Sequence, residues 1–289
     1  MELLKQLEIG FRRFLLRMLA LFIRRDRAIP SDIDFNRCTF LFVRQDRIGD
    51  VLVSTPLFVE LKSRYPSCTI DILLSKNNYF VLDNEPLIRK RWIFRKNIFA
   101  IWRLLKDLRA EHYDFVIDLM DNPSATSTLL LALSGGRWNI GLSKENSYVY
   151  DVAIPLLSRR DTHIVDRLSE LLRVFNISVD RNKLRLRYNV SASSAEFAES
   201  FWSSQQLSGS VVVGVNISAG SGVRFWGVAH FRTLIQQIQS NYPTYIVLIL
   251  FHPSDQSAAK AIGADFSKVI LSPLTHSFDQ FAAMIRRVS

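Results

Sequence analysis

Cysteine and histidine are scarce in this sequence, and their spacing argues against two kinds of site. The two cysteines, Cys38 and Cys68, form no Cys-x-x-Cys pair, so we expect two reduced thiols in the core rather than a disulfide framework. The five histidines include no close pair at the spacing of metal ligands, and we therefore predict no metal site. No segment matches Gly-x-Gly-x-x-Gly or a Walker A sequence, which disfavours dinucleotide and P-loop sites.

A membrane-spanning run is also missing from the amino terminus. Residues 11–23 are mostly apolar, but the run is too short to span a bilayer, is broken by Arg17 and lacks the cleavage site of a secretory signal. An amphipathic helix over residues 1–30 fits this pattern, with arginines of residues 1–27 facing the phosphates of an anionic membrane surface. A helix packed onto the protein's own body fits it nearly as well.

An excess of basic residues narrows the range of partners. The 37 lysines and arginines outnumber the 27 acidic residues and give a formal net charge of +10, which favours nucleic acid, nucleotide-sugar phosphates or an anionic membrane face. No recognised nucleic-acid-binding motif is present, so we expect no nucleic acid partner. The basic and aromatic run over residues 89–96 fits contact with nucleic acid or lipid headgroups, and it also fits a solvated edge beside a core-directed Trp92.

From residue 38 onward, strand-like and helix-like segments alternate, which is typical of parallel sheets covered by helices. We predict an α/β protein with a first domain over residues 37–190 and a second over residues 208–289, joined by a helix. The expected strands are 38–43, 69–74, 115–119, an edge strand at 184–188, 211–216, 245–251 and 269–271; the expected helices are 51–65, 98–108, 124–133, 163–175, 231–239, 254–262 and 278–287.

The polar turn after the first strand is the strongest candidate site, because open α/β sheets bind ligands at the carboxyl ends of their strands. Gly49 would allow a tight passage from strand to helix, and Asp50 falls in the first helical turn. Two roles fit Asp50 equally well: a general base that takes a proton from a hydroxyl, or the N-cap of the helix. Arg44, Asp46 and Arg47 form either an anion site or a local ion-pair network.

Two further loops follow predicted strands. The loop from Asn216 to Trp226 resembles a phosphate-binding turn in which Arg224 would neutralise a diphosphate, or is a flexible glycine turn with a solvated arginine. Asp118, Asp121 and Asn122 would hydrogen-bond sugar hydroxyls, or cap a helix that Pro123 begins.

Four segments together resemble glycosyltransferase family 9, the ADP-heptose:lipopolysaccharide heptosyltransferases. Residues 46–57 (Asp-Arg-Ile-Gly-Asp-Val-Leu-Val-Ser-Thr-Pro-Leu) are similar to the family's opening signature. Residues 113–119, 134–141 and 215–226 are similar to its fourth-strand region, its Ser-Gly-Ala segment and its entry to the donor domain. The resemblance implies a GT-B fold of two Rossmann-like domains, with an acceptor-side first domain and a nucleotide-sugar-binding second domain.

The resemblance also implies an activity and a site. It implies inverting transfer of a heptose or related sugar from an ADP-heptose donor to a lipopolysaccharide-type acceptor, without a cofactor, at the cytoplasmic face of the inner membrane. Asp50 aligns with the family's proposed catalytic base, and Ser218 and Arg224 with the region that contacts the donor phosphates. The substrate-binding and donor-binding residues expected on these grounds are Arg44, Asp46, Arg47, Gly49, Asp118, Asn122, Asn216, Ser218, Gly220 and Arg224.

The sequence departs from the family pattern in the second domain. Ile217-Ser218 replaces Pro-Gly, and Arg224 stands where lysine is usual. A later Asp-Thr/Ser…His-x-Ala motif would lie beyond Ser289, so we expect an incomplete second domain and weakened donor binding. The alternative function is that of an inactive remnant that binds an anionic glycan or lipid.

Overall fold

The computed structural model describes Phe14, Met18 and residues 25–288, and these form two compact units, residues 1–189 and 190–289. Most of the predicted amphipathic helix lies outside the described residues. Its last part, residues 25–30, is not helical. The Arg25 guanidinium is paired with Asp151 at 2.8 Å, so it contacts the protein rather than lipid phosphates. No helix within the described ranges has the length and apolar character to cross a membrane.

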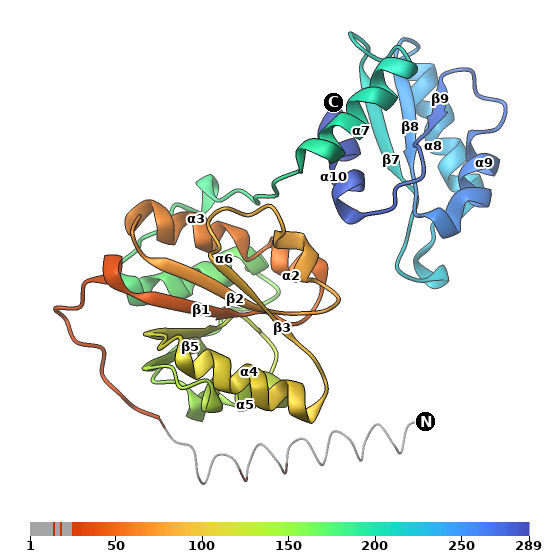
Figure 1. Ribbon diagram of the computed structural model, residues 1–289. Helices are drawn as coiled ribbons and strands as arrows, with labels where there is room; N and C mark the ends of the chain where they lie inside the picture. Colours follow the sequence, from red (N-terminus) through yellow and green to blue (C-terminus); the bar gives the residue numbers. More distant parts are fainter. Residues whose placement is uncertain (1–13, 15–17, 19–24, 289) are drawn as a thin grey trace. The chain divides into compact units, whose positions relative to one another are not determined.

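The first unit is built on a sheet in which six described strands are all parallel, in the order β3-β2-β1-β4-β5-β6. Side chains of β1 alternate between the two faces: Phe40 and Phe42 pack on one, Leu41 and Val43 on the other. Helices α3 and α6 cover the first face, and α4 and α5 cover the second (Figure 1). The elements are η1 (Phe35–Arg37), β1 (Thr39–Val43), α2 (Ile48–Leu52), α3 (Thr55–Arg64), β2 (Thr69–Ser75), η2 (Tyr79–Leu82), β3 (Lys90–Phe94), α4 (Ile98–Ala110), β4 (Phe115–Asp118), α5 (Ala125–Leu133), β5 (Trp138–Leu142), η3 (Ser147–Val149), β6 (Val152–Ile154), α6 (Ile164–Ser169), η4 (Glu170–Phe175) and η5 (Arg181–Lys183).

The single helix predicted over residues 51–65 is wrong, because the chain forms two helices, α2 and α3, in this region. Pro56 has no amide hydrogen to donate to the carbonyl of Leu52, and a proline ring cannot be accommodated inside a continuous helix. The hydroxyl of Thr55 donates to that carbonyl instead, at 2.7 Å. The break fixes α2 as a short separate element that directly follows the first loop.

The first unit differs from the sequence-based expectations at several other elements. The edge strand predicted at residues 184–188 does not form; the amide of Arg187 donates to the side chain of Thr55 at 2.9 Å. The helix predicted at 163–175 is α6 followed by the 3-10 helix η4. Helix α5 begins at Ala125 with Ser124 as its N-cap, not at Pro123. Strands β3, β5 and β6 were not expected.

The second unit is a sheet in which the described strands β7, β8 and β9 are parallel and adjacent in that order. Helices α8 and α9 pack on one face of this sheet, and α7 and α10 on the other. The predicted linker helix is therefore wrong in its role: α7 belongs to the second unit, which begins at Val190 rather than at residue 208. Its elements are α7 (Ala192–Ser204), β7 (Val212–Asn216), η6 (Gly222–Arg224), α8 (Val228–Asn241), β8 (Ile246–Leu250), η7 (Pro253–Asp255), α9 (Gln256–Gly263), β9 (Val269–Leu271) and α10 (Phe278–Arg287).

Candidate functional site

Arg44 is the centre of the site in the first unit. Its backbone amide donates to the carbonyl of Leu73 at 2.9 Å, which continues the pairing of β1 with β2 one residue beyond the strand. Its side chain is fully buried. A buried guanidinium is costly unless its donors are satisfied, so the groups around Arg44 decide whether this loop keeps its shape.

Two carboxylates and two carbonyls surround this guanidinium. Nε lies 3.1 Å from a carboxylate oxygen of Asp46, and Nη2 lies 3.2 Å from one of Asp50. Nε also donates to the carbonyl of Asp50 at 3.0 Å, and Nη1 donates to the carbonyl of Leu119, just beyond β4. Arg44 thereby joins the carboxyl ends of β1 and β4 to the first turn of α2.

Asp50 is the third residue of α2 rather than its N-cap, which is the position of Arg47. One carboxylate oxygen of Asp50 accepts from the amide of Arg47 at 3.3 Å, while the other faces Arg44. The side chain is about one-third exposed, with 34% of its surface accessible. The arrangement holds a carboxylate at the helix N-terminus and leaves it open to solvent on one side.

Asp46 shares the guanidinium and is more enclosed than Asp50. Burial raises the pKa of Asp46 to about 6, and the neighbouring carboxylate of Asp50 adds to that rise, while Arg44 opposes it. The side-chain amide of Asn78 donates to the carbonyls of Arg44 and Asp46, at 3.3 Å each, and so fixes the loop from the side of β2. Asp46 therefore loses its proton closer to neutral pH than an ordinary aspartate does.

Gly49 has a different role from the one expected. Its backbone is helical, and a Cβ placed there would meet no atom within 4 Å. The tight passage from strand to helix therefore does not require glycine. Gly49 and Arg47 are both exposed at the turn that carries Asp50.

Asp118 lies in the interior of the unit and does not line an open surface. Its carboxylate accepts from the hydroxyl of Tyr150 at 2.7 Å, the ammonium of Lys144 at 3.0 Å and the hydroxyl of Ser127 at 3.4 Å. The side chain is fully buried, so a sugar hydroxyl would have to displace one of these donors. Asp118 instead ties β4 to the segment after β5.

The loop after β4 is held by arginines. Asn122 accepts from Arg159 at 2.8 Å through its side-chain oxygen. Asp121 is paired with Arg167 at 2.9 Å and with Arg159 at 3.5 Å. Both side chains thus belong to a network of ion pairs and hydrogen bonds that joins the loop after β4 to α6 and the segment before it.

In the second unit, a cavity of about 570 Å³ lies at the carboxyl end of the sheet. Asn216 lines it at the end of β7, and its side-chain oxygen accepts from the amide of Ser218 at 3.1 Å. The hydroxyl of Ser218 accepts from the amide of His252 and donates to Asp255, both at 2.6 Å, so it holds the loop after β8 in place. The lining residues are Asn216, Ser218, Phe251, His252, Pro253, Thr275, His276, Ser277, Phe278 and Phe281.

Gly220 and Arg224 are not among the residues that line this cavity. Gly220 has open space around it, and Arg224 is exposed in η6 without a hydrogen bond or ion pair of its side chain in the described part of the chain. The structure thus brings Asn216 and Ser218 to the cavity and leaves Arg224 in solvent. The loop after β8 and the start of α10 line the same cavity, and neither was expected from the sequence to contribute.

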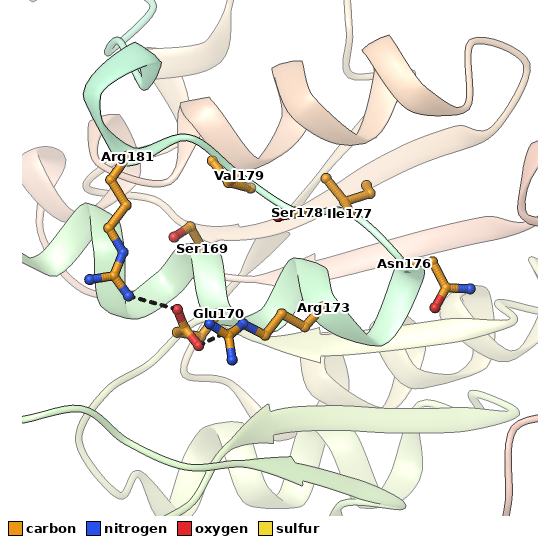
Figure 2. Close-up of a pocket in the computed structure, with 8 residues that line it drawn as sticks. All are labelled: Ser169, Glu170, Arg173, Asn176, Ile177, Ser178, Val179 and Arg181. Atoms are coloured by element: carbon orange, nitrogen blue, oxygen red, sulfur yellow. Dashed lines mark hydrogen bonds and ion pairs between the residues drawn. The ribbon is translucent and has the colours of Figure 1, made fainter.

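A smaller hollow of about 310 Å³ lies on the first unit, along η4 and the loop that follows (Figure 2). Glu170 sits there between two arginines, 2.9 Å from Arg173 and 2.9 Å from Arg181. The carboxylate already occupies one donor of each guanidinium. No residue of this hollow belongs to the set predicted from the sequence.

Comparison with known proteins identifies the chain. The model of glycosyltransferase family 9 (heptosyltransferase) matches residues 101–289, which is more than half of the chain. The chain belongs to glycosyltransferase family 9. The resemblance inferred from the motifs is therefore confirmed.

Relatives of this family 9 chain share its architecture. A lipopolysaccharide heptosyltransferase 3 of Escherichia coli is 34% identical over 80 residues, so the match spans about a quarter of that protein (24%) and 25% of this chain. The crystal structure of a family 9 glycosyltransferase from Veillonella parvula superposes with a TM-score of 0.73 at 17% identity, covering 89% of this chain and 74% of that one. The E. coli heptosyltransferase WaaC with ADP gives 0.62 at 17% identity, covering 86% and 78%. These likenesses confirm the predicted GT-B-like α/β fold with parallel sheets.

Proposed function

We propose that this family 9 protein is an inverting glycosyltransferase that moves a heptose or related sugar from ADP-heptose to a lipopolysaccharide-core-type acceptor. The observation that supports the proposal most directly is the partly exposed carboxylate of Asp50, held by the buried Arg44 at the carboxyl end of β1. A fixed, partly exposed carboxylate is the group that deprotonation of an acceptor hydroxyl requires.

The reaction can be written around this carboxylate. Asp50 accepts the proton of the acceptor hydroxyl as its oxygen attacks the anomeric carbon of the sugar. The bond from that carbon to the ADP oxygen breaks on the opposite face, and ADP leaves with the electron pair. Arg44 holds the carboxylate of Asp50 in place, and it is a positioning residue because its side chain is buried.

We place the ADP portion of the donor in the cavity of the second unit. Phe278 and Phe281 offer apolar surface to a base, while Asn216, Thr275 and Ser277 offer polar groups. Helix α10 begins at this cavity, and a helix N-terminus favours the negative charge of a diphosphate. The exposed Arg224, in η6 after β7, is available to neutralise the leaving group.

We propose no resident cofactor, since the ADP-sugar is itself a substrate. We propose that Arg224 and helix N-termini neutralise the diphosphate. An acceptor of this kind lies at the membrane, which suits a peripheral location on the inner face of the inner membrane.

The test measures release of ADP from ADP-heptose with a deep-rough lipopolysaccharide acceptor. Asp50→Asn should lower kcat by about 10²–10⁴-fold, because general-base catalysis contributes about that much, while the KM for ADP-heptose stays the same. The matched control is Asp83→Asn, which removes an exposed carboxylate paired with Arg91 on the same unit. Equal rates for wild type and Asp50→Asn would remove Asp50 as the base.

A binding measurement separates the two functions that the sequence left open. If wild type shows no turnover but calorimetry detects binding of the lipopolysaccharide acceptor, the protein is an inactive binder of anionic glycan or lipid. Binding of ADP to the second unit, lost in Phe281→Asp, would favour the enzyme, since a remnant needs no donor site.

A further inference from the structure

Helix α4 carries the most exposed of the large apolar side chains in the described part of the first unit. Ile98, Phe99 and Trp102 are 76%, 82% and 69% exposed. Its opposite side carries Leu104 and Leu108, which are buried against the sheet. At 3.6 residues per turn, the three exposed side chains share one side of the helix, in its first two turns. Neighbouring large apolar side chains that are exposed to water together indicate an interaction site.

Basic side chains surround this patch. Arg95 and Lys96 precede the helix, and Arg103 and Lys106 lie on the same side of it; all four are exposed. Within the described part of the chain, none of the four forms an ion pair with an acidic residue. Lys106 instead lies 5.9 Å from the centre of the Trp102 ring.

Negative charge is nearly absent from the same surface. Asp107 is the one acidic residue between positions 95 and 110. Glu111, which follows the helix, is already paired with Arg89 at 2.6 Å and with Lys90 at 2.9 Å. The surface therefore carries a net positive charge that the protein itself does not neutralise.

We propose that the exposed side of α4, which consists of Ile98, Phe99, Trp102 and the flanking Arg95, Lys96, Arg103 and Lys106, docks on an anionic lipid bilayer. Apolar side chains that protrude from a helix insert at the boundary between headgroups and acyl chains, where tryptophan is favoured, and unpaired lysines and arginines contact the lipid phosphates. A polyanion such as nucleic acid would satisfy the charges but would leave the aliphatic Ile98 in water. The proposal does not depend on the enzymatic function or on residues 1–27.

Insertion can be followed at one position. Phe99→Cys provides a single reactive thiol, because Cys38 and Cys68 are both buried and burial raises the pKa of Cys38 to about 12. An environment-sensitive dye on residue 99 should shift to the blue and resist an aqueous quencher when vesicles of phosphatidylcholine and phosphatidylglycerol (7:3) are added. Heparin, a polyanion without acyl chains, should produce no such change. The same dye at Leu186→Cys should stay in water. Leu186 is an exposed apolar residue on the other face of the sheet, where the amide of the next residue, Arg187, donates to Thr55 of α3.

Partitioning of the full chain provides the second measurement. Replacing Ile98, Phe99 and Trp102 together by glutamine, a good helix former, should lower the vesicle partition coefficient at least tenfold. Arg103→Gln with Lys106→Gln should lower binding several-fold on anionic vesicles and leave the weak binding to neutral vesicles unchanged. Leu186→Gln is the matched control and should bind as wild type does.

Three results would overturn the proposal. One is a dye at residue 99 that stays in water while the chain binds vesicles, which would assign binding to another segment. The second is a blue shift with heparin alone, which would indicate a polyanion partner. The third is a wild-type dimer in light scattering that the triple glutamine variant makes monomeric, which would assign the face to a second copy of the chain.

Discussion

At the scale of single residues, the site in the first unit depends on one buried guanidinium. Arg44 forms ion pairs with Asp46 and Asp50 and donates hydrogen bonds to two backbone carbonyls, a geometry that a lysine ammonium cannot reproduce. The sequence left open whether Arg44, Asp46 and Arg47 bind an anion or form a local ion-pair network, and whether Asp50 is a general base or an N-cap. In the structure Arg44 pairs with Asp46 and Asp50, while Arg47 takes the N-cap position of α2. The pairing also holds Asp50 in place and leaves it partly exposed.

The raised pKa of Asp46 predicts a specific dependence of stability on pH. A carboxyl whose pKa is higher in the folded chain than in the unfolded chain keeps its proton longer when folded. The free energy of unfolding therefore falls as pH rises from the unfolded value, about 4, through the folded value, about 6. Asp46→Asn removes this dependence.

We compare the free energy of unfolding of Asp46→Asn with that of wild type. The difference, variant minus wild type, should rise between pH 4 and pH 6 and be level above pH 7. One pKa unit corresponds to about 1.4 kcal/mol, and water still reaches a quarter of the side chain, so the total rise should be about 1–2 kcal/mol. Hydrogen exchange of peptides from β1, measured at several pH values, gives this difference locally. Two curves that stay parallel from pH 4 to pH 8 would contradict the prediction.

At the scale of elements, the structure gives a packing reason for Gly141, the last residue of the family-like segment 134–141. Gly141 lies in β5, and a Cβ there would come within 2.4 Å of the ring of Tyr150. The hydroxyl of Tyr150 donates to the buried Asp118 at 2.7 Å. The glycine therefore provides the space that lets a tyrosine ring reach the end of β4.

Gly141→Ala should lower the free energy of unfolding of the first unit by about 2–3 kcal/mol. Overpacking accounts for about 1–3 kcal/mol, and displacement of Tyr150 adds the loss of a hydrogen bond to a buried carboxylate. Urea denaturation checks the value. The matched control is Gly49→Ala, because a Cβ at that position would have no atom within 4 Å. An alanine in this helix should leave the free energy of unfolding unchanged or raise it by up to about 1 kcal/mol. Equal stability of Gly141→Ala and wild type would contradict the packing argument.

The strands and helices that the sequence predicted correctly are those with strong apolar patterns. Strand β1 and the elements from β7 to α10 lie within a few residues of their expected bounds. The buried side chains of a parallel strand form an almost continuous apolar run, and such runs are visible in a sequence. The prediction of two free cysteines in the core is confirmed: Cys38 and Cys68 are buried directly before β1 and β2.

The missed elements depended on neighbours far away in the chain. Strand β3 begins with Lys90 and Arg91, whose charges are tolerated because the strand is at the edge of the sheet and Glu111 pairs with Lys90. The segment around Arg187 alternates like a strand, but its amide donates to the side chain of Thr55, 132 residues away. The interior position of Asp118 depends likewise on Lys144 and Tyr150, which no local pattern brings to it.

At the scale of the whole molecule, each unit has its own two-sided core. In the second unit, one core joins α8 and α9 to the sheet, and the other joins α7 and α10 to it. Helix α7 is tied to α10 through Ser191, whose hydroxyl donates to Asp279 at 2.5 Å. The segment that resembled a linker in the sequence is therefore part of the core of the second unit, which it precedes in the chain. We infer that the two units unfold as separate cooperative blocks.

Met284 tests this inference, because it is completely buried in α10 against the side chains of α7 and the sheet. Met284→Ala should destabilise the second unit by about 2–4 kcal/mol through the lost contacts and the cavity left behind. Hydrogen exchange followed by mass spectrometry should show faster exchange in β7 and β8, with β1 and β4 unchanged, since their cores contain no residue of α10. Ile285→Ala is the matched control: its side chain is 46% exposed, and both units should stay within about 0.5 kcal/mol of wild type. Equal loss of protection in β1 and β7 after Met284→Ala would show that the chain unfolds as one block.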